Sequence, residues 1–200
     1  MAHYPSDLRS LWFGLVICLA TLFLGFAEGV VFGAADQSVR TWLIEKAQSA
    51  VASSPDSTVP DPQARVDRAW TFFRRSHLHA NGMATTGIVL IALLPLVSAR
   101  RGIKQAIAGA LGLGSAGYAA FLITAGLRTP GVGDTHLVKE SLRWLAMPSA
   151  GMYVAATLGI IVLVCRWAWG SRSSDGGGLP DSVVEAKPGS HHPAELASVS

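Results

Sequence analysis

Four long apolar stretches dominate the pattern of hydrophobic and polar positions along the chain. They cover about residues 11–35, 79–99, 105–127 and 144–165, and the first contains a single ionisable residue, Glu28. A helix needs about 20 apolar residues to cross the roughly 30 Å hydrocarbon core of a bilayer. The pattern therefore predicts four membrane-spanning helices packed as a bundle, and an all-α fold.

The segments outside the four stretches carry other patterns. In the first loop, apolar residues recur at helical spacing before a proline-rich break at 53–62, which predicts an interfacial amphipathic helix. Residues 65–75 again have a helical pattern, so the second helix is expected to be longer than the membrane is thick. Residues 137–145 are expected to extend the fourth helix in the same way. Residues 170–200 are rich in Gly, Ser, Pro and Asp, which predicts a disordered tail beyond a bundle of residues 1–169.

Composition and charge agree with a membrane protein. Half of the residues are hydrophobic, only 14% are charged, and the mean hydropathy is +0.38. The lipid bilayer is thus the first expected partner, and the formal net charge of +3 gives no reason to expect nucleic acid. The short turn between the second and third spans holds Arg100, Arg101 and Lys104 and no acidic residue. By the positive-inside rule, this turn and both termini are predicted to be cytoplasmic in a multi-pass protein of the cell membrane.

Small residues recur every four positions in three of the spans. The first span has Gly25, Gly29 and Gly33; the others have Ala108, Gly112, Ala116 and Ala120, and Gly151, Ala155 and Gly159. In lipid, such stripes allow close approach of helix backbones. They predict either tight packing within the bundle or an interface between copies of the chain, and both uses stay open.

The polar residues that could perform chemistry are few, and four spans bring them to one side of the membrane. They are Glu28, His77, His79, Asn81, Arg128, Asp134 and His136. A carboxyl inside a span, as at Glu28, costs a few kcal/mol to keep there, so it is expected to point at a neighbouring helix. It could be a protonatable group in a cavity, the partner of Arg74, Arg75 or a histidine, or a structural hydrogen-bonding group.

The two histidines at the start of the second span lie two residues apart. Side chains at that spacing on a helix point about 200° away from each other, so His77 and His79 are not expected to bind one ion through the same face. Asn81 and Thr85 continue the His77 face at four-residue steps, which favours His77 over His79 as a metal ligand. Two interfacial histidines without a metal are the alternative.

Several short motifs lie along residues 10–168: Arg74-Arg75-Ser76-His77, Asn81-Gly82-Met83, Leu93-Leu94-Pro95-Leu96, a third span of small residues, Gly131-Val132-Gly133-Asp134, and Pro148 early in the fourth span. In these motifs the chain resembles the styrene oxide isomerase type of small membrane protein. The resemblance implies a trimer of four-helix bundles with haem b bound by a histidine near the start of helix two. The ferric iron of that family acts as a Lewis acid that opens an epoxide to an aldehyde.

The resemblance also suggests roles for individual residues. His77 or His79 would bind the iron, with Arg75, Met83 and His136 completing the cofactor-binding set. Asn81 would orient the oxygen of a small lipophilic substrate, and Glu28 is the second candidate catalytic residue. The chain departs from the family at two places: Arg75 stands where the ligand histidine is expected, and Tyr118 is out of register with the tyrosine expected in helix three. Haem binding is therefore expected more strongly than rapid epoxide isomerisation.

Three classes of function remain open at this point. The first is a haem-binding membrane enzyme related to the epoxide isomerases. The second is a small proton-coupled transport subunit that uses Glu28. The third is a structural or assembly protein without a cofactor.

Overall fold

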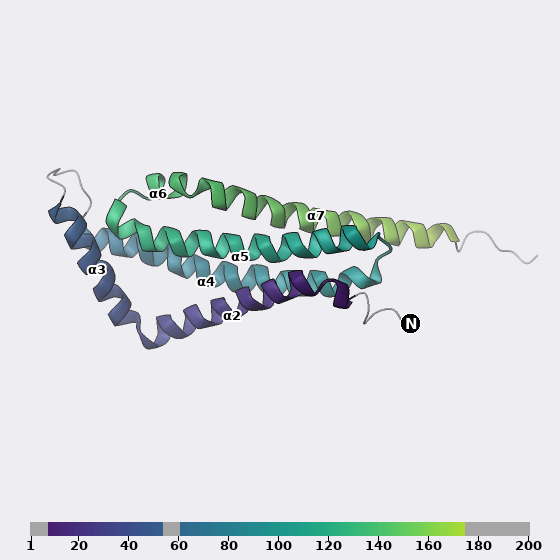
Figure 1. Ribbon diagram of the computed structural model, residues 1–200, viewed down its shortest axis with the longest axis horizontal. Helices are drawn as coiled ribbons and strands as arrows, with labels where there is room; N and C mark the ends of the chain where they lie inside the picture. The colour runs from purple at the N-terminus through teal and green to yellow at the C-terminus, as the bar shows by residue number, and fades with distance from the viewer. Residues whose placement is uncertain (1–7, 54–60, 175–200) are drawn as a thin grey trace, which may run out of the picture.

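The computed structural model describes residues 8–53 and 61–174, and this part of the chain is helical without any strand. Its elements are listed in chain order: α2 (Trp12–Ala34), α3 (Asp36–Ala52), α4 (Pro62–Leu93), the short 3₁₀ helix η1 (Leu94–Leu96), α5 (Arg101–Val132), α6 (Thr135–Ser141) and α7 (Arg143–Ser174). The long helices α2, α4, α5 and α7 run side by side, while α3 turns away from α2 at one end (Figure 1). The predicted all-α class is confirmed.

Four helices are long and apolar enough to cross a membrane, as expected for an integral membrane protein. They correspond to the four predicted spans, and Pro62–Leu96 extends well before the apolar stretch that begins near residue 79. The prediction of an unusually long second helix is therefore confirmed. The large side chains left exposed on α2 and α7, such as Phe23 at 73% and Trp144 at 71%, form the apolar surface that lipid would cover.

The helix ends follow from local sequence. The Asp61 side chain accepts a hydrogen bond from the Gln63 amide at 3.1 Å, and Pro62 occupies the first turn of α4, where its missing N–H costs nothing. Gly133 ends α5 with φ of +80°, a conformation that favours glycine. Asp134 then caps α6 by accepting from the His136 amide at 2.7 Å.

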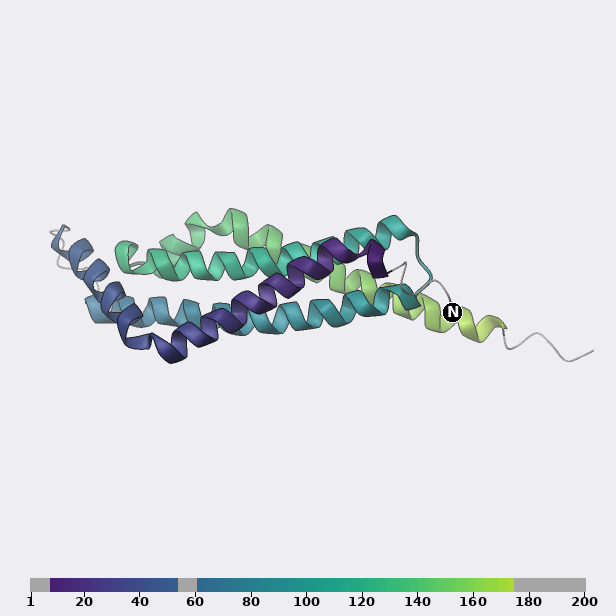
Figure 2. The ribbon, with the colours of Figure 1, turned by 60° about the horizontal axis from the view of Figure 1, so that its bottom comes forward.

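Small residues let the spans approach closely within the chain. A Cβ added to Gly14 of α2 would lie 2.1 Å from the Ala108 carbonyl oxygen of α5, and one on Gly114 would lie 2.8 Å from the Ser149 carbonyl oxygen of α7. Figure 2 shows α2 crossing in front of α4 and α5. Gly33 and Gly151 have open space instead. Of the predicted stripes, Gly25, Gly29, Ala108 and Gly112 pack inside the bundle, whereas Gly33, Ala120, Gly151 and Ala155 do not.

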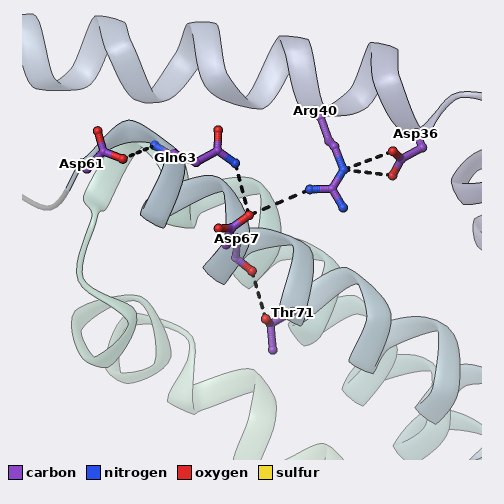
Figure 3. Close-up of polar contacts among 6 residues, drawn as sticks. All are labelled: Asp36, Arg40, Asp61, Gln63, Asp67 and Thr71. Carbon is purple, nitrogen blue, oxygen red and sulfur yellow. Dashed lines mark hydrogen bonds and ion pairs between the residues drawn. The ribbon is translucent and has the colours of Figure 1, made fainter.

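Helix α3 is the predicted amphipathic segment of the first loop, and it packs on α4. Its buried Leu43 and Ala47 lie in a cluster with Val66, Ala69 and Phe73 of α4. Arg40 pairs with Asp36 at 3.1 Å and reaches Asp67 of α4 at 3.9 Å, as Figure 3 shows. Its guanidinium also lies 4.3 Å from the centre of the Trp70 ring. These contacts hold α3 against α4.

Two predicted features differ in the structure. Only residues 143–145 of the predicted extension belong to the fourth span, because the helix is interrupted at the buried Leu142 (φ −110°, ψ 8°), which leaves α6 as a separate seven-residue helix. The Ser141 hydroxyl donates to the Val138 carbonyl and accepts from Arg128, which stabilises this break. Helix α7 also runs to Ser174, so the first residues of the predicted tail are helical, and residues 175–200 lie outside the described residues.

Candidate functional site

The predicted polar residues gather at the end of the bundle where α2 meets α3 and α5 meets α6. Glu28 lies next to Ser76 and His77 of α4, whereas His79 and His136 line one cavity. The side chains are nevertheless divided between two faces of α4. One face packs against α2, and the other looks toward α5, α6 and α7.

The α2-facing side of α4 is closely packed and hydrogen-bonded. The His77 Nδ1–H donates to the Gly25 carbonyl oxygen at 2.8 Å, and the Asn81 side-chain amide donates to the His77 carbonyl oxygen at 3.0 Å. A Cβ on Gly25 would lie 2.6 Å from Asn81 Oδ1, and one on Gly29 would lie 2.9 Å from His77 Cε1. Glycine at both positions is therefore what admits these two polar side chains between the helices. The predicted stripe of His77 and Asn81 is used for packing α2 on α4.

Glu28 belongs to the same side and is half-buried. Its Oε2 atom is buried and has no hydrogen-bond partner among the described residues, and the same is true of Asn81 Oδ1. Ser76 and His77 are the α4 side chains that face the carboxyl. No ion pair joins Glu28 to Arg74 or Arg75 in the described part of the chain. Glu28 thus points toward its neighbours in the bundle, and the alternative that pairs it with an arginine has no support here.

The opposite side of α4 presents His79. Its Nδ1–H donates to the Arg75 carbonyl oxygen one turn earlier, at 2.8 Å. The imidazole lies beside the Tyr118 ring of α5, with ring centroids 5.3 Å apart. Since Nδ1 is engaged with a backbone carbonyl, Nε2 is the nitrogen available to a ligand, which is the arrangement usual for metal-binding histidines.

His79 lines a cavity of about 530 Å³ between α4, α5, α6 and α7. Its apolar wall includes Phe72, Phe121, Leu122, Ala146 and Met147. His136 lines it from α6, together with three cationic side chains, Arg75, Lys139 and Arg143, and the acidic Glu140, which pairs with Arg143 at 3.3 Å. Three of the five residues predicted to bind a cofactor therefore line the same cavity: Arg75 and His79 from α4, and His136 from α6.

Met83 lies one turn further along α4. Its backbone carbonyl accepts a hydrogen bond from the Tyr153 hydroxyl of α7 at 2.8 Å. The Met83 side chain lines a smaller cavity together with His79, Thr86 and Tyr153. Its place is thus adjacent to the His79 cavity rather than inside it.

The donor set can be compared with what a metal or a haem would need. Within residues 8–53 and 61–174, no three His, Cys, Asp or Glu side chains form a group able to hold a bare metal ion. Haem asks for less from the protein, because the porphyrin occupies four coordination positions and one histidine is enough. A histidine with a fixed Nδ1, an apolar and aromatic wall, and cations to meet two propionates are present together around His79. The residues around His79 are therefore of the kinds that a haem site uses.

Two tyrosines and two cations were missed as site residues by sequence reasoning. Tyr118 is out of register with the tyrosine expected from the resemblance, yet its ring contacts His79, and Tyr153 joins α7 to α4. Lys139 of α6 and Arg143 of α7 line the cavity because the chain turns back after α5 and α6 packs beside α5. The signal that could have found Tyr118 is its position three residues before Phe121 on one helix face, since both rings lie together in the structure at 5.6 Å.

The fold and the site describe an all-helical bundle with four possible membrane spans and a histidine-lined cavity near one end. The chain matches no protein-family model, no curated protein and no solved structure. The resemblance to the styrene oxide isomerases therefore stays a prediction.

Proposed function

We propose that this protein is a haem-binding membrane protein, with haem b held in the cavity between α4, α5, α6 and α7. The observation that carries the proposal is His79, a cavity-lining imidazole whose Nδ1 is fixed by the Arg75 carbonyl oxygen at 2.8 Å. Nε2 of His79 would bind the iron. This assignment reverses the order expected from the sequence, which favoured His77.

His77 is less suited to the role because its surroundings are filled. The Gly25 carbonyl, Asn81 and the α2 backbone at Gly29 enclose its ring. A smaller cavity of about 450 Å³ does lie beside it, lined by Arg74 and Asp36 among others. That cavity offers one cation and one carboxylate, so two propionates would meet less positive charge there than beside His79.

The side chains around the His79 cavity suggest how the cofactor would be oriented. Arg75 and Lys139 would pair with the propionates, since Arg143 is paired with Glu140 at 3.3 Å, and Phe72, Phe121 and Leu122 would exclude water from the ring faces. Bound haem supplies an iron centre for Lewis-acid or redox chemistry. His136 lines the same cavity, and a second histidine on the iron would leave no position for a substrate.

We expect the haem-loaded protein to isomerise small epoxides slowly at most. Asn81 lies on the α2-facing side of α4, about 200° around the helix from His79, so it would not reach an oxygen held above the iron. Tyr118 is the polar side chain of helix α5 that lines the cavity in its place. Because misplacement by about 1 Å can cost about a hundredfold in rate, a pocket without Asn81 should open small lipophilic epoxides slowly or not at all.

The test is haem binding by the full chain purified in a neutral detergent. Titration with haemin should give a Soret band that saturates at one haem per chain, and His79→Ala should lose it. Added imidazole should restore the band in His79→Ala by replacing the missing side chain. A band that is unchanged in His79→Ala would overturn the assignment of the ligand, and absence of saturable binding in the wild type would overturn the proposed function.

The same preparation tests the enzymatic part. Styrene oxide should be converted to phenylacetaldehyde only slowly by the haemin-loaded protein, and His136→Ala should raise the rate if His136 occupies the sixth position. Turnover at a rate typical of enzymes, about 1–1,000 s⁻¹, would show that the cavity positions a substrate better than proposed. With no haem bound, the structural and transport classes would be the ones left.

A further inference from the structure

A second cavity lies where α2 and α3 diverge, away from the His79 cavity. Its volume is about 560 Å³, and it is bounded by α2 and α3, with one side chain from α4 and two from α5. Phe32 of α2, Trp42 of α3 and Phe73 of α4 supply its aromatic walls. Figure 1 shows the two helices separating at this end of the bundle.

Glu28 is the one ionisable residue among those that line this cavity. Its Oε2 atom has no hydrogen-bond partner in the described structure, and no lysine or arginine there forms an ion pair with it. From α4 the carboxyl meets the Ser76 hydroxyl, a neutral hydrogen-bonding group, and His77, whose Nδ1 donates to Gly25 at 2.8 Å. A carboxylate in such a place lacks a positive partner, and an incoming cation would supply one.

The aromatic side chains suit the same kind of ligand. A cation near the face of an aromatic ring is stabilised by the ring quadrupole, and the effect grows when water is excluded. Trp42 already takes a cation on one face, because Lys46 Nζ lies 4.8 Å from its ring centre. Phe32 and Phe73 lie with ring centroids 6.3 Å apart. Both the walls and the single carboxyl therefore select for positive charge carried on an apolar body.

We propose that this cavity binds a lipophilic organic cation, with its apolar groups among Phe32, Trp42 and Phe73 and its charge beside Glu28. A lipid acyl chain would satisfy the apolar walls but leave the Glu28 carboxyl without a partner, so charge complementarity favours the cation. The inference is independent of haem, since the two cavities share no lining residue.

Tetraphenylphosphonium is a suitable probe because it is apolar, permanently charged and unable to donate a hydrogen bond. Isothermal titration of the full chain in a neutral detergent should show saturable binding. Glu28→Gln keeps the shape of the side chain and removes its charge, so it should weaken the affinity at least about tenfold. Trp42→Ala should weaken it about fivefold through loss of the ring contact. Asp36→Asn removes a carboxylate from the same elbow without touching the cavity lining, and it should leave the affinity unchanged.

Two further measurements keep the test decisive. Glu28→Asp retains the charge and should retain more affinity than Glu28→Gln, which separates loss of charge from loss of folding; circular dichroism of each variant checks the helices. Triphenylmethane, an uncharged aromatic probe, should bind more weakly than the cation and should be insensitive to Glu28→Gln. Equal binding of tetraphenylphosphonium by wild type and Glu28→Gln, or tighter binding of the uncharged probe, would overturn the proposal and favour an acyl chain as occupant.

Discussion

The two faces of α4 carry the same kind of residue in opposite surroundings. His77 is half-buried against α2, because Gly25 and Gly29 remove the side chains that would otherwise keep the helices apart, and its remaining side borders the cavity of about 450 Å³. His79 is exposed and borders a cavity of about 530 Å³. Each imidazole donates Nδ1–H to a backbone carbonyl at 2.8 Å, but for His77 the carbonyl belongs to another helix and for His79 to its own. The first bond joins two helices, and the second only orients a ring, so the same residue type is structural on one face and available for binding on the other.

The comparison predicts opposite outcomes for two matched alanine variants, and this is the largest effect expected. His77→Ala should lower the stability of the bundle and leave haemin binding in place, because its ring is a contact between α2 and α4. His79→Ala should leave stability nearly unchanged and abolish haemin binding. Thermal unfolding in detergent and the Soret titration measure the two properties separately. If both variants lost both properties, the two faces would not be functionally distinct.

A smaller but still large effect is expected from closing the space that glycine leaves on the α2-facing side. A Cβ on Gly25 would lie 2.6 Å from Asn81 Oδ1, so Gly25→Ala should destabilise the protein by about 1–3 kcal/mol, as overpacked cores do. Gly33→Ala is the matched control on the same stripe, because a Cβ there meets nothing within 4 Å. Unfolding of both variants in a denaturing detergent series gives the comparison.

The double variant sharpens the same point. Gly25→Ala combined with Asn81→Ala removes the atom that the new methyl group meets, so it should cost less than the sum of the two single changes. Additive effects would mean that the backbone of α2, rather than Asn81, limits the approach of the helices.

A hydrogen bond on the opposite side of α4 should have a more modest effect. The Tyr153 hydroxyl donates to the Met83 carbonyl oxygen at 2.8 Å, joining α7 to α4. Tyr153→Phe keeps the ring and removes the donor, so the loss of stability should be about 0.5–1.5 kcal/mol. Thermal unfolding of the variant, with Tyr118→Phe as the control for a hydroxyl without a helix-to-helix hydrogen bond, measures it. A loss above that range would show that the hydroxyl has a further partner.

Much of the fold could be predicted from the sequence, because span length and helix ends depend on local residues. Apolar runs located the four long helices, and the spacing from Val39 to Val51 located α3. The break at Leu142 could not be predicted, since it depends on Arg128 and on burial against other helices. The site was predictable only in part: helix geometry separated His77 from His79, but which of them faces a cavity depends on where α2 and α6 pack.

The smallest expected effect concerns the cationic side chains around the His79 cavity. It tests whether they contribute to haemin binding by pairing with the propionates. Lys139 lines the cavity with its Nζ 5.9 Å from the centre of the Phe72 ring, and it is exposed to solvent. An exposed charge pair contributes little, so Lys139→Gln should weaken haemin binding only about two- to fivefold. The difference should vanish near 1 M salt, where the screening length falls to about 3 Å. Lys46→Gln is the matched control, because Lys46 also lies over an aromatic ring but on α3, outside this cavity. Equal weakening by both variants would show that the chain's net charge, rather than a propionate partner at this face, sets the affinity.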